Sequence, residues 1–413
     1  MPSARALPIP STSAPFPSSC NNVHNCRTLW DIVTSCMATV FSCTWVAIHP
    51  NIPAIDDKWW TISFRRAKLM VLALIAPELV ILWAMRQWYV ARDLAKRYQG
   101  RGWTLTHGFF AGMGGFMLSH GNTSFTLGPQ DFNDLLTIGA IDFPTVTEDQ
   151  IDDKNKSDTL AKALAALQLS WFMFQCIMRT VEHLPLTELE VMTLAFTILT
   201  MPSRAFWWQK PLNVRLPVPV KIRDYSAILI LKGEQELSEK RDPPKEQYSP
   251  SFGICVIDDL VTFIAHPVCE TDGTFSLVKP NSSRVRTLFA GETTPQEDTA
   301  IYNFIGCVAM VFGAIHCIAW SSEFTSDIEL LLWRVSSAVL IGVPALHLVW
   351  HFLLHIDSLS KTLQRMSSYV VPTTSVLYAL ARFTLIFQSF ASLRSLSPGS
   401  YDATSWTAYI PHL

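Results

Sequence analysis

The sequence has little charge for its length. Charged residues make up 16% of the 413 residues, whereas soluble domains usually carry about 25%. The formal net charge is only -2, so the composition shows no basic surface of the kind that binds nucleic acid, and we expect no nucleic-acid partner. Hydrophobic residues make up 49%. This balance argues against a water-soluble protein and favours one that places much of its chain in lipid.

The sequence also lacks the usual signs of a disulfide framework and of a secretory signal. Its nine cysteines form no C-x-x-C pair, and several lie within apolar runs, where a free cysteine behaves as a small hydrophobic residue. Residues 1–28 are rich in Pro and Ser and contain no apolar core of the signal type. They are predicted to form a disordered tail.

Long apolar runs are abundant. A membrane-spanning helix needs about 20 mostly apolar residues, and we predict a span in each of seven runs: 29–48, 69–88, 160–179, 188–208, 301–320, 328–352 and 369–391. The predicted fold is therefore all-α, a polytopic transmembrane helix bundle of about seven spans surrounded by membrane lipids. The sequence leaves the plasma membrane and the endoplasmic reticulum both open as its location.

Polar segments divide the predicted spans into two groups. Spans one to four occupy 29–208 with a polar loop at 119–158, and spans five to seven occupy 301–394, before a tail at 395–413. Residues 209–300 are predicted to form a Pro-punctuated, partly disordered cytoplasmic loop. The glycine-containing run 104–118 is too short for a comfortable span and is predicted to be re-entrant or interfacial.

The distribution of Lys and Arg predicts an orientation, because cytoplasmic loops carry an excess of these residues. The loop 321–327 and the segment after Arg394 contain neither, so we expect them outside the cytoplasm. Seven spans then place the N-terminus inside. One detail opposes this topology: the first outside loop would hold Lys58, Arg65 and Arg66.

Five stretches carry a resemblance to a known family. In chain order they read "TVFSCTWVAIHPNIP", "APELVILWAMRQW", "HGFFAGMGGF", "LPLTELEVMTLAF" and "FWWQKPLNV". Together they resemble a large family of uncharacterised fungal multi-pass membrane proteins, over Thr39 to Val214. The resemblance implies the membrane architecture and brings no reaction or cofactor with it.

An ionisable side chain within a predicted span is the clearest functional candidate. Glu78 lies about midway along 69–88, beside Pro77, where we expect a kink that frees backbone carbonyls. A charge at such a position costs about 2.5–3.5 kcal/mol on insertion scales, so we expect Glu78 to face the bundle. It is either a proton-carrying or cation-stabilising carboxylate, or a hydrogen-bonded structural residue paired with Arg334 or Arg382.

Three histidines recur at a spacing of four in "HLVWHFLLH", at His347, His351 and His355. The first and third lie about 12 Å apart along one helix face, so a metal ion with bonds near 2.1 Å could take only two neighbours. Another helix would have to supply the rest, and we predict a metal set of His347, His351 and His316. A proton relay, or an interfacial position for His351 and His355, is the alternative.

Two further motifs have simpler explanations. Thr187 and Glu190 fit a capping box at the start of a helix. The doublet Asp56–Asp57 could bind magnesium and a diphosphate only with a second acidic motif, and the nearest one, at 133–142, lies across the membrane in the predicted topology.

Three functions compete. The first is a membrane-embedded enzyme that acts on a lipophilic isoprenoid or lipid substrate by acid/base chemistry, with Glu78, His107 and His351 as its catalytic residues. The second is a transporter or channel, although no inverted repeat is visible. The third is a scaffold that works through 209–300. The enzyme is narrowly preferred.

Overall fold

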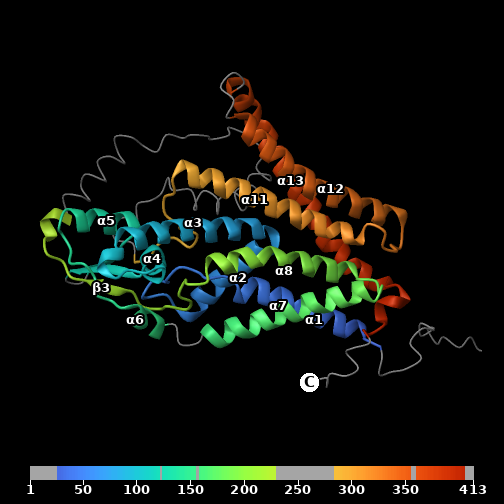
Figure 1. Cartoon of the computed structure of the whole chain (residues 1–413), viewed down its shortest axis with the longest axis horizontal. Coiled ribbons are helices and arrows are strands. Elements are labelled where there is room, and N and C mark those ends of the chain that lie inside the picture. The colour runs from blue at the N-terminus through green and yellow to red at the C-terminus, as the bar shows by residue number, and fades with distance from the viewer. Residues whose placement is uncertain (1–25, 121–122, 155–157, 229–282, 355–359, 405–413) are drawn as a thin grey trace, which may run out of the picture.

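The protein is mainly helical (Figure 1). The structure, a computed structural model, describes residues 26–120, 123–154, 158–228, 283–354 and 360–404. The predicted all-α class is confirmed for the greater part of the described chain, and one small sheet is the exception.

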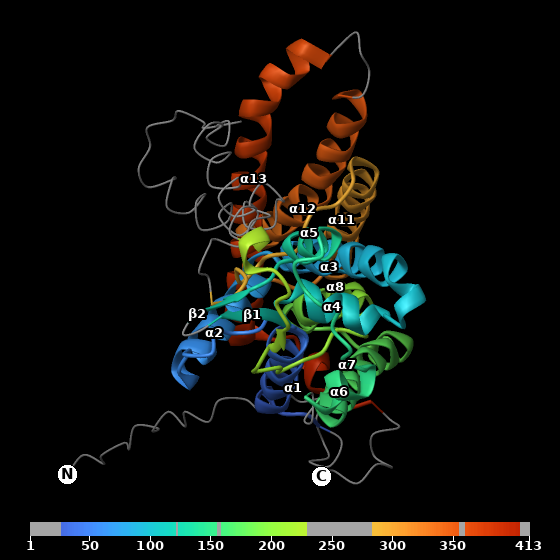
Figure 2. The same cartoon turned by 90° about the vertical axis from the view of Figure 1, so that its left-hand side faces the viewer.

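A bundle of long helices forms the body of the molecule. Its members are α1 (Leu29–Phe41, continued by a π-helical turn Ser42–Val46), α7 (Asp158–Val181), α8 (Glu188–Phe206), α11 (Pro295–His316), α12 (Asp327–Leu354) and α13 (Ser360–Ala391). Helix α8 contacts α1, α7, α11 and α13 and is therefore the central helix. Helices α12 and α13 extend beyond the others as an adjacent pair (Figure 2).

Five helical segments are long and apolar enough to cross a membrane. They are Leu29–Val46, Lys162–Val181, Pro295–Ala319, Asp327–Leu353 and Tyr369–Ser395. Only 17% to 33% of each is buried inside the protein, so most of their apolar side chains face outward, as expected of helices that contact lipid. These segments match five of the seven predicted spans.

The second predicted span, 69–88, is not a single helix. It covers the junction of α2 (Trp59–Ile75) and α3 (Pro77–Arg97), which are bent by 112°. The residue before a proline is driven out of the helical region, and Ala76 accordingly has φ -144° and ψ 69°. The kink predicted at Pro77 is thus a bend that divides the span into two helices, which the sequence did not show because the apolar run continues through it.

The fourth predicted span corresponds to α8, which is not among the five apolar segments. This helix is buried along most of its length, and beside the π-helical turn after α1 it is polar, with Thr197 and Thr200 against the Cys43 thiol. Small polar residues allow helices to approach closely. Seven spans are therefore not confirmed.

A small mixed domain lies at one end of the bundle, on the left in Figure 1. It consists of α4 (Leu105–Gly112), β1 (Phe116–His120), β2 (Thr123–Thr126), α5 (Pro129–Thr137), α6 (Glu148–Asp153) and β3 (Val218–Val220). Strand β1 pairs antiparallel with β2 and parallel with β3. The run 104–118 is thus a short helix followed by a strand, and both predicted polar loops contribute to this domain.

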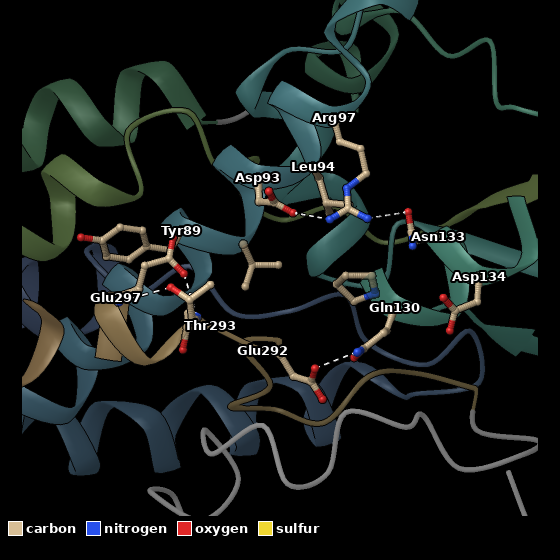
Figure 3. Close-up of a pocket in the computed structure, with 13 residues that line it drawn as sticks. Tyr89, Asp93, Leu94, Arg97, Gln130, Asn133, Asp134, Glu292, Thr293 and Glu297 are labelled. Atoms are coloured by element: carbon tan, nitrogen blue, oxygen red, sulfur yellow. Dashed lines mark hydrogen bonds and ion pairs between the residues drawn. The ribbon is translucent and has the colours of Figure 1, made fainter. Parts of the chain in front are cut away.

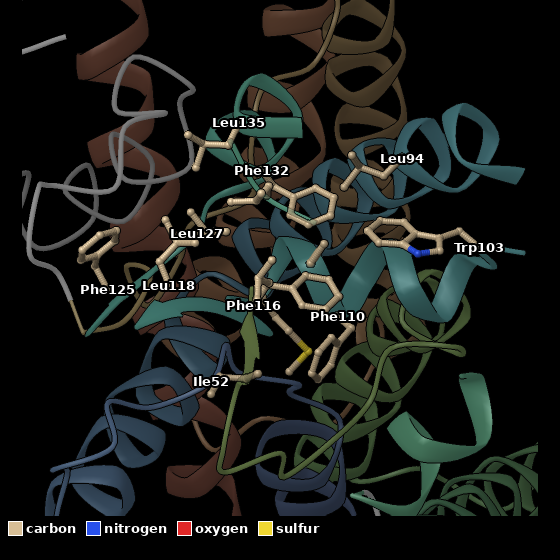
Figure 4. Packing of buried hydrophobic residues seen from close by; sticks show 14 of the residues in the cluster. Ile52, Leu94, Trp103, Phe110, Phe116, Leu118, Phe125, Leu127, Phe132 and Leu135 are labelled. Carbon is tan, nitrogen blue, oxygen red and sulfur yellow. The ribbon is translucent and has the colours of Figure 1, made fainter. Parts of the chain in front are cut away.

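Aromatic stacking holds the small domain together (Figure 4). The ring of Trp103 stacks on Phe116 and Phe132 at centroid distances of 5.8 and 5.3 Å, and those two rings stack on each other at 5.2 Å. All three side chains are almost fully buried. Such parallel stacking adds to the hydrophobic contribution of each ring.

The two ends of the bundle differ. At the end opposite the sheet, here the Cys26 end, Cys26 forms a β-bridge with Asp402, and the Arg27 N–H donates to the Tyr401 carbonyl at 2.9 Å. The Arg27 guanidinium also bonds the buried Glu190 carboxylate. Cys26 is disulfide-bonded, a bond that the absence of a disulfide framework in the sequence did not reveal. The opposite end is called the sheet end.

Candidate functional site

Glu78 lies in the first turn of α3, directly after the break between α2 and α3. Nη1 of Arg382 donates to both of its carboxylate oxygens, at 2.9 and 2.7 Å, and the Tyr378 hydroxyl donates to one of them at 2.6 Å. The predicted pairing with Arg382 is confirmed. The alternative partner, Arg334, instead donates to the Trp320 carbonyl at 2.9 Å.

The Glu78–Arg382 pair is enclosed by the bundle. Glu78 is 7% exposed and Arg382 2% exposed, and Arg382 lies near the middle of the candidate span Tyr369–Ser395. The guanidinium lies 4.1 Å from the ring centroid of Phe312. A paired and stacked charge of this kind is the form in which a membrane interior tolerates ionised groups.

The histidines of α12 have ordinary partners. Nε2 of His347 lies 2.7 Å from the Thr374 hydroxyl, and the His351 ring stacks on Tyr302 at 4.5 Å. His355 lies outside the described residues. His316 is buried, and its Nδ1 lies 2.8 Å from the Phe312 carbonyl.

The structure does not bring His316 together with His347. The Tyr302 hydroxyl donates to the His347 carbonyl, whereas the Trp333 indole donates to the His316 carbonyl. Residues 302 and 316 of α11 are about 20 Å apart along the helix axis, so His316 and His347 lie too far apart to share one ion. Within the described ranges, no group of three or more His, Cys, Asp or Glu side chains is placed to hold a metal.

His107 belongs to the small domain and not to the bundle. Its Nδ1 lies 3.2 Å from the Thr104 backbone nitrogen and 3.0 Å from the Thr104 hydroxyl, at the start of α4, and its Nε2 lies 2.9 Å from the Val146 carbonyl. The three predicted catalytic residues Glu78, His107 and His351 thus occupy separate places and form no common site.

Two simpler predictions also have structural outcomes. Thr187 and Glu190 form the expected capping box of α8. Asp57 is paired with Arg65 at 3.0 Å and accepts from the Ala54 N–H, so this carboxylate of the acidic doublet serves local structure.

A fully buried lysine is the feature that the sequence did not reveal. Lys210, 1% exposed, follows α8, and its ammonium donates to the His49 carbonyl, to Gln87 Oε1 at 2.8 Å and to Asn51 Oδ1 at 3.4 Å. Gln87 in turn donates to the Phe289 carbonyl at 2.8 Å. The Lys210 cluster, defined by these residues, therefore ties α3 and the segment after α8 to the segments around residues 50 and 289.

The Lys210 cluster is also aromatic. The ammonium lies 5.0 Å from the ring centroids of both Trp83 and Trp207, a cation–π arrangement that favours its charged form. Burial acts in the opposite direction and lowers the pKa of Lys210 well below its usual range. Burial likewise lowers the pKa of His49 well below 6.5. Because His49 Nδ1 bonds the Ala47 carbonyl, its Nε2 is an acceptor. This atom is buried and has no hydrogen-bond donor among the described residues.

The family resemblance marks the residues of this cluster but not their contacts. His49, Asn51, Gln87 and Lys210 all belong to the stretches that carry the family resemblance. Neither hydrophobic periodicity nor local spacing could show that three stretches so far apart in the chain meet at one ammonium group.

A polar cavity of about 410 Å³ lies near the small domain (Figure 3). Helices α3 and α5 and the segment leading into α11 form its walls. Arg97 bridges Asp93 and Asn133 at 3.0 and 2.9 Å, and Gln130 donates to Glu292 at 2.7 Å. Most of its charged groups therefore have partners within the protein.

A second cavity, of about 370 Å³, lies at the Cys26 end. It is lined by 185–188, 321–323 and 395–400. Its lining includes several serines and the buried Glu188, whose carboxyl group bonds Ser322 and Ser392. These contacts tie three interhelical segments together at this end.

Comparison with known proteins identifies a family and no activity. The model of a family described as "Family of unknown function (DUF8562)" matches residues 7–232. No curated protein and no solved structure matches the chain. The matched range includes α1 to α8 and the Lys210 cluster up to Lys210 itself, whereas Tyr378 and Arg382 lie beyond it. The match gives no information about a fungal source or a membrane, and both remain predictions from the sequence.

Proposed function

The chain belongs to a family of unknown function, and we propose from its geometry that it is an integral membrane protein that transports a small molecule. The Glu78–Arg382 pair is its functional centre. Plasma membrane and endoplasmic reticulum both remain compatible with this proposal.

We propose further that the chain crosses the membrane six times. Six helical segments connect the Cys26 end with the sheet end: α1, α7, α8, α11, α12 and α13. Helix α8 has 19 residues and thus a length of about 28 Å, close to the roughly 30 Å hydrocarbon thickness. The α2–α3 pair begins and ends on the sheet side and enters the bundle at its bend. An even number of crossings accounts for the contact between Cys26 and Asp402.

The Cys26 end then faces away from the cytoplasm. Disulfides persist in oxidising compartments, and Cys26 is disulfide-bonded. The loop 321–327 and residues 395–404, which lie at the same end, contain no Lys or Arg. In this topology the basic residues that opposed seven spans become cytoplasmic: Arg66 contacts Trp45 and Asn213 at the sheet end. The six-crossing topology thus places Lys58, Arg65 and Arg66 on the side that the positive-inside rule favours, whereas the seven-span topology placed them outside.

One observation carries the transport proposal: a helix break coincides with an ion pair in the interior of the bundle. Irregular backbone at membrane depth is tolerated where protein buries it or where it lines a pathway, and transporters commonly form their substrate sites at broken helices. The break at Ala76 places Glu78 against Arg382 of α13. A pair that can separate and re-form provides two states for a carrier.

The lipid-modifying enzyme predicted from the sequence is the competing function. It requires a proton donor next to its other catalytic groups. Here Glu78 is engaged by a guanidinium and a phenol, and His107 bonds the Val146 carbonyl in another domain. The transport proposal needs no such assembly and is therefore preferred.

The test is untargeted profiling of metabolites and lipids in cells and, separately, in their medium. Cells would express the wild type, Glu78→Gln or Asp93→Asn at equal membrane abundance. Asp93→Asn is the matched control, because it also removes a carboxylate from an Arg pair, but an exposed one. We expect one compound to shift between cells and medium with the wild type and with Asp93→Asn, but not with Glu78→Gln.

The other outcomes are equally specific. A new compound that appears with the wild type and disappears with Glu78→Gln would replace transport by enzymatic turnover. Identical profiles for the wild type and Glu78→Gln would exclude the Glu78–Arg382 pair as the functional centre of either activity.

A further inference from the structure

The Arg382 guanidinium has a free edge. A guanidinium carries five N–H donors, and only Nη1 is used in the pair with Glu78. Nε and Nη2 are buried and have no acceptor among the described residues. Buried polar groups are nearly always satisfied, and a charged group has the most to lose when its donors are not. The free edge therefore calls for an acceptor from outside the described part of the chain, and a bound molecule can supply it.

Three aromatic rings lie close to the guanidinium group. The guanidinium carbon lies 4.1 Å from the ring centroid of Phe312, 5.7 Å from Tyr378 and 5.9 Å from Phe196. These residues belong to α11, α13 and α8, so the group is enclosed by several helices. Apolar walls with a few fixed polar groups are typical of sites for small molecules.

The charge of Arg382 is already balanced. Its partner Glu78 lies at 2.7 Å, so the pair contributes no net charge to the interior of the bundle. An anionic ligand would add an uncompensated negative charge next to Glu78, and that is costly in a medium of low dielectric constant. An uncharged oxygen acceptor adds none.

We propose that the Nε and Nη2 edge of Arg382 binds the carbonyl or hydroxyl oxygen of an uncharged lipophilic molecule, whose hydrocarbon part lies against Phe196 and Phe312. This inference rests on the proposed transport function and names the class of its substrate. Tyr378 is a positioning residue, because its hydroxyl holds Glu78 and through it the orientation of Arg382.

The experiment is equilibrium binding to the purified full-length protein in dodecylmaltoside micelles. The probe is tritiated hexadecan-2-one, with hexadecan-1-ol, hexadecane and hexadecanoate as competitors. We expect saturable binding of the ketone, displacement by the alcohol, and at least about tenfold weaker displacement by hexadecane, which lacks an acceptor. Equal competition by hexadecane and the alcohol would overturn the proposal, because binding would then not require an oxygen acceptor. Equal competition by hexadecanoate would also overturn it, because binding would then not require an uncharged ligand.

Variants locate the site. Arg382→Lys retains a cation for Glu78 but loses the free edge, so we expect at least about tenfold weaker ketone binding. Arg394→Lys makes the same substitution at an exposed arginine and should change affinity by less than about threefold. Should Arg382→Lys fail to fold, Phe196→Trp enlarges the ring that lies 5.9 Å from the guanidinium carbon, leaves Glu78 and Arg382 unchanged, and should weaken binding as well. Unchanged affinity in Phe196→Trp or in folded Arg382→Lys would overturn the site.

Binding and transport are measured independently. Ketone binding that depends on Arg382, together with unchanged cell and medium profiles, would support the site and overturn transport. A Glu78-dependent shift of a charged, water-soluble compound without ketone binding would support transport and overturn this substrate class.

Discussion

At the scale of single residues, His49 connects stability to pH. Burial lowers the pKa of its folded form well below 6.5, the value expected when the chain is unfolded. The unfolded chain therefore binds the extra proton first, and stability is lost as the pH falls below about 6.5, by up to about 1.4 kcal/mol per pH unit. We expect the midpoint of thermal unfolding in detergent to decrease when the pH is lowered from 7.5 to 5.5. The decrease should be smaller for His49→Gln than for the wild type.

His183→Asn is the matched control. His183 is exposed and adopts a positive φ of 56° that asparagine tolerates, so this variant should keep the full pH dependence of the wild type. An equal drop in all three proteins would mean that His49 is not buried as a neutral ring.

Residue pairings were predictable only in part. The Glu78–Arg382 pair could be predicted because an intramembrane carboxylate needs a cation and few were available. The capping box at Thr187 and Glu190 was predictable from local spacing alone. The environment of Lys210 was not, because its acceptors come from segments around residues 49, 51 and 87, and sequence spacing carries no information about such long-range contacts.

At the scale of elements, the contact between α3 and α4 depends on one glycine. A Cβ atom added at Gly108 would lie 2.1 Å from the Ala91 carbonyl oxygen, whereas one added at Gly112, in the same helix, would meet nothing within 4 Å. Gly108→Ala must push the helices apart, at a cost of about 1–3 kcal/mol or more. We expect a clearly lower thermal midpoint for Gly108→Ala and an unchanged or higher one for Gly112→Ala.

Equal midpoints for the two variants would contradict this close approach. The result is specific to Gly108 because backbone, and not a flexible side chain, occupies the space beside this glycine. Glycine at such a position permits close contact between two helices.

Helices that are continuous apolar runs were predicted well. Segments in which a helix is broken, or in which short strands form, were not. The outer helices α7, α11, α12 and α13 are continuous apolar runs and were placed to within several residues at most ends. A kink was predicted beside Pro77, but the division of the span into two helices was not, because the apolar run continues through the junction. The strands β1 to β3 were missed because each is at most five residues long and depends on partners from distant segments.

At the scale of the whole molecule, the distribution of charge and the disulfide together constrain the orientation. Hydrophobic runs alone gave seven spans, because an apolar run predicts burial without distinguishing lipid from protein. The central helix α8 and the bent α2–α3 pair are the cases where this distinction matters. Apolar runs do not show which helix ends lie together. The β-bridge between Cys26 and Asp402 does, because it places the start of α1 beside the segment that follows α13.

The two topologies place Lys58 on opposite sides of the membrane. Seven spans put this exposed residue outside the cytoplasm, whereas six crossings put it in the cytoplasm beside the small domain. Sealed endoplasmic-reticulum microsomes expose their cytoplasmic face, so a membrane-impermeant maleimide should label Lys58→Cys and the control Asp93→Cys above the background of the parent chain. Glu323→Cys, at the Cys26 end, should be labelled only after detergent is added. Protection of Lys58→Cys together with Glu323→Cys would restore the seven-span topology, and the bend at Ala76 would then have to straighten in the membrane.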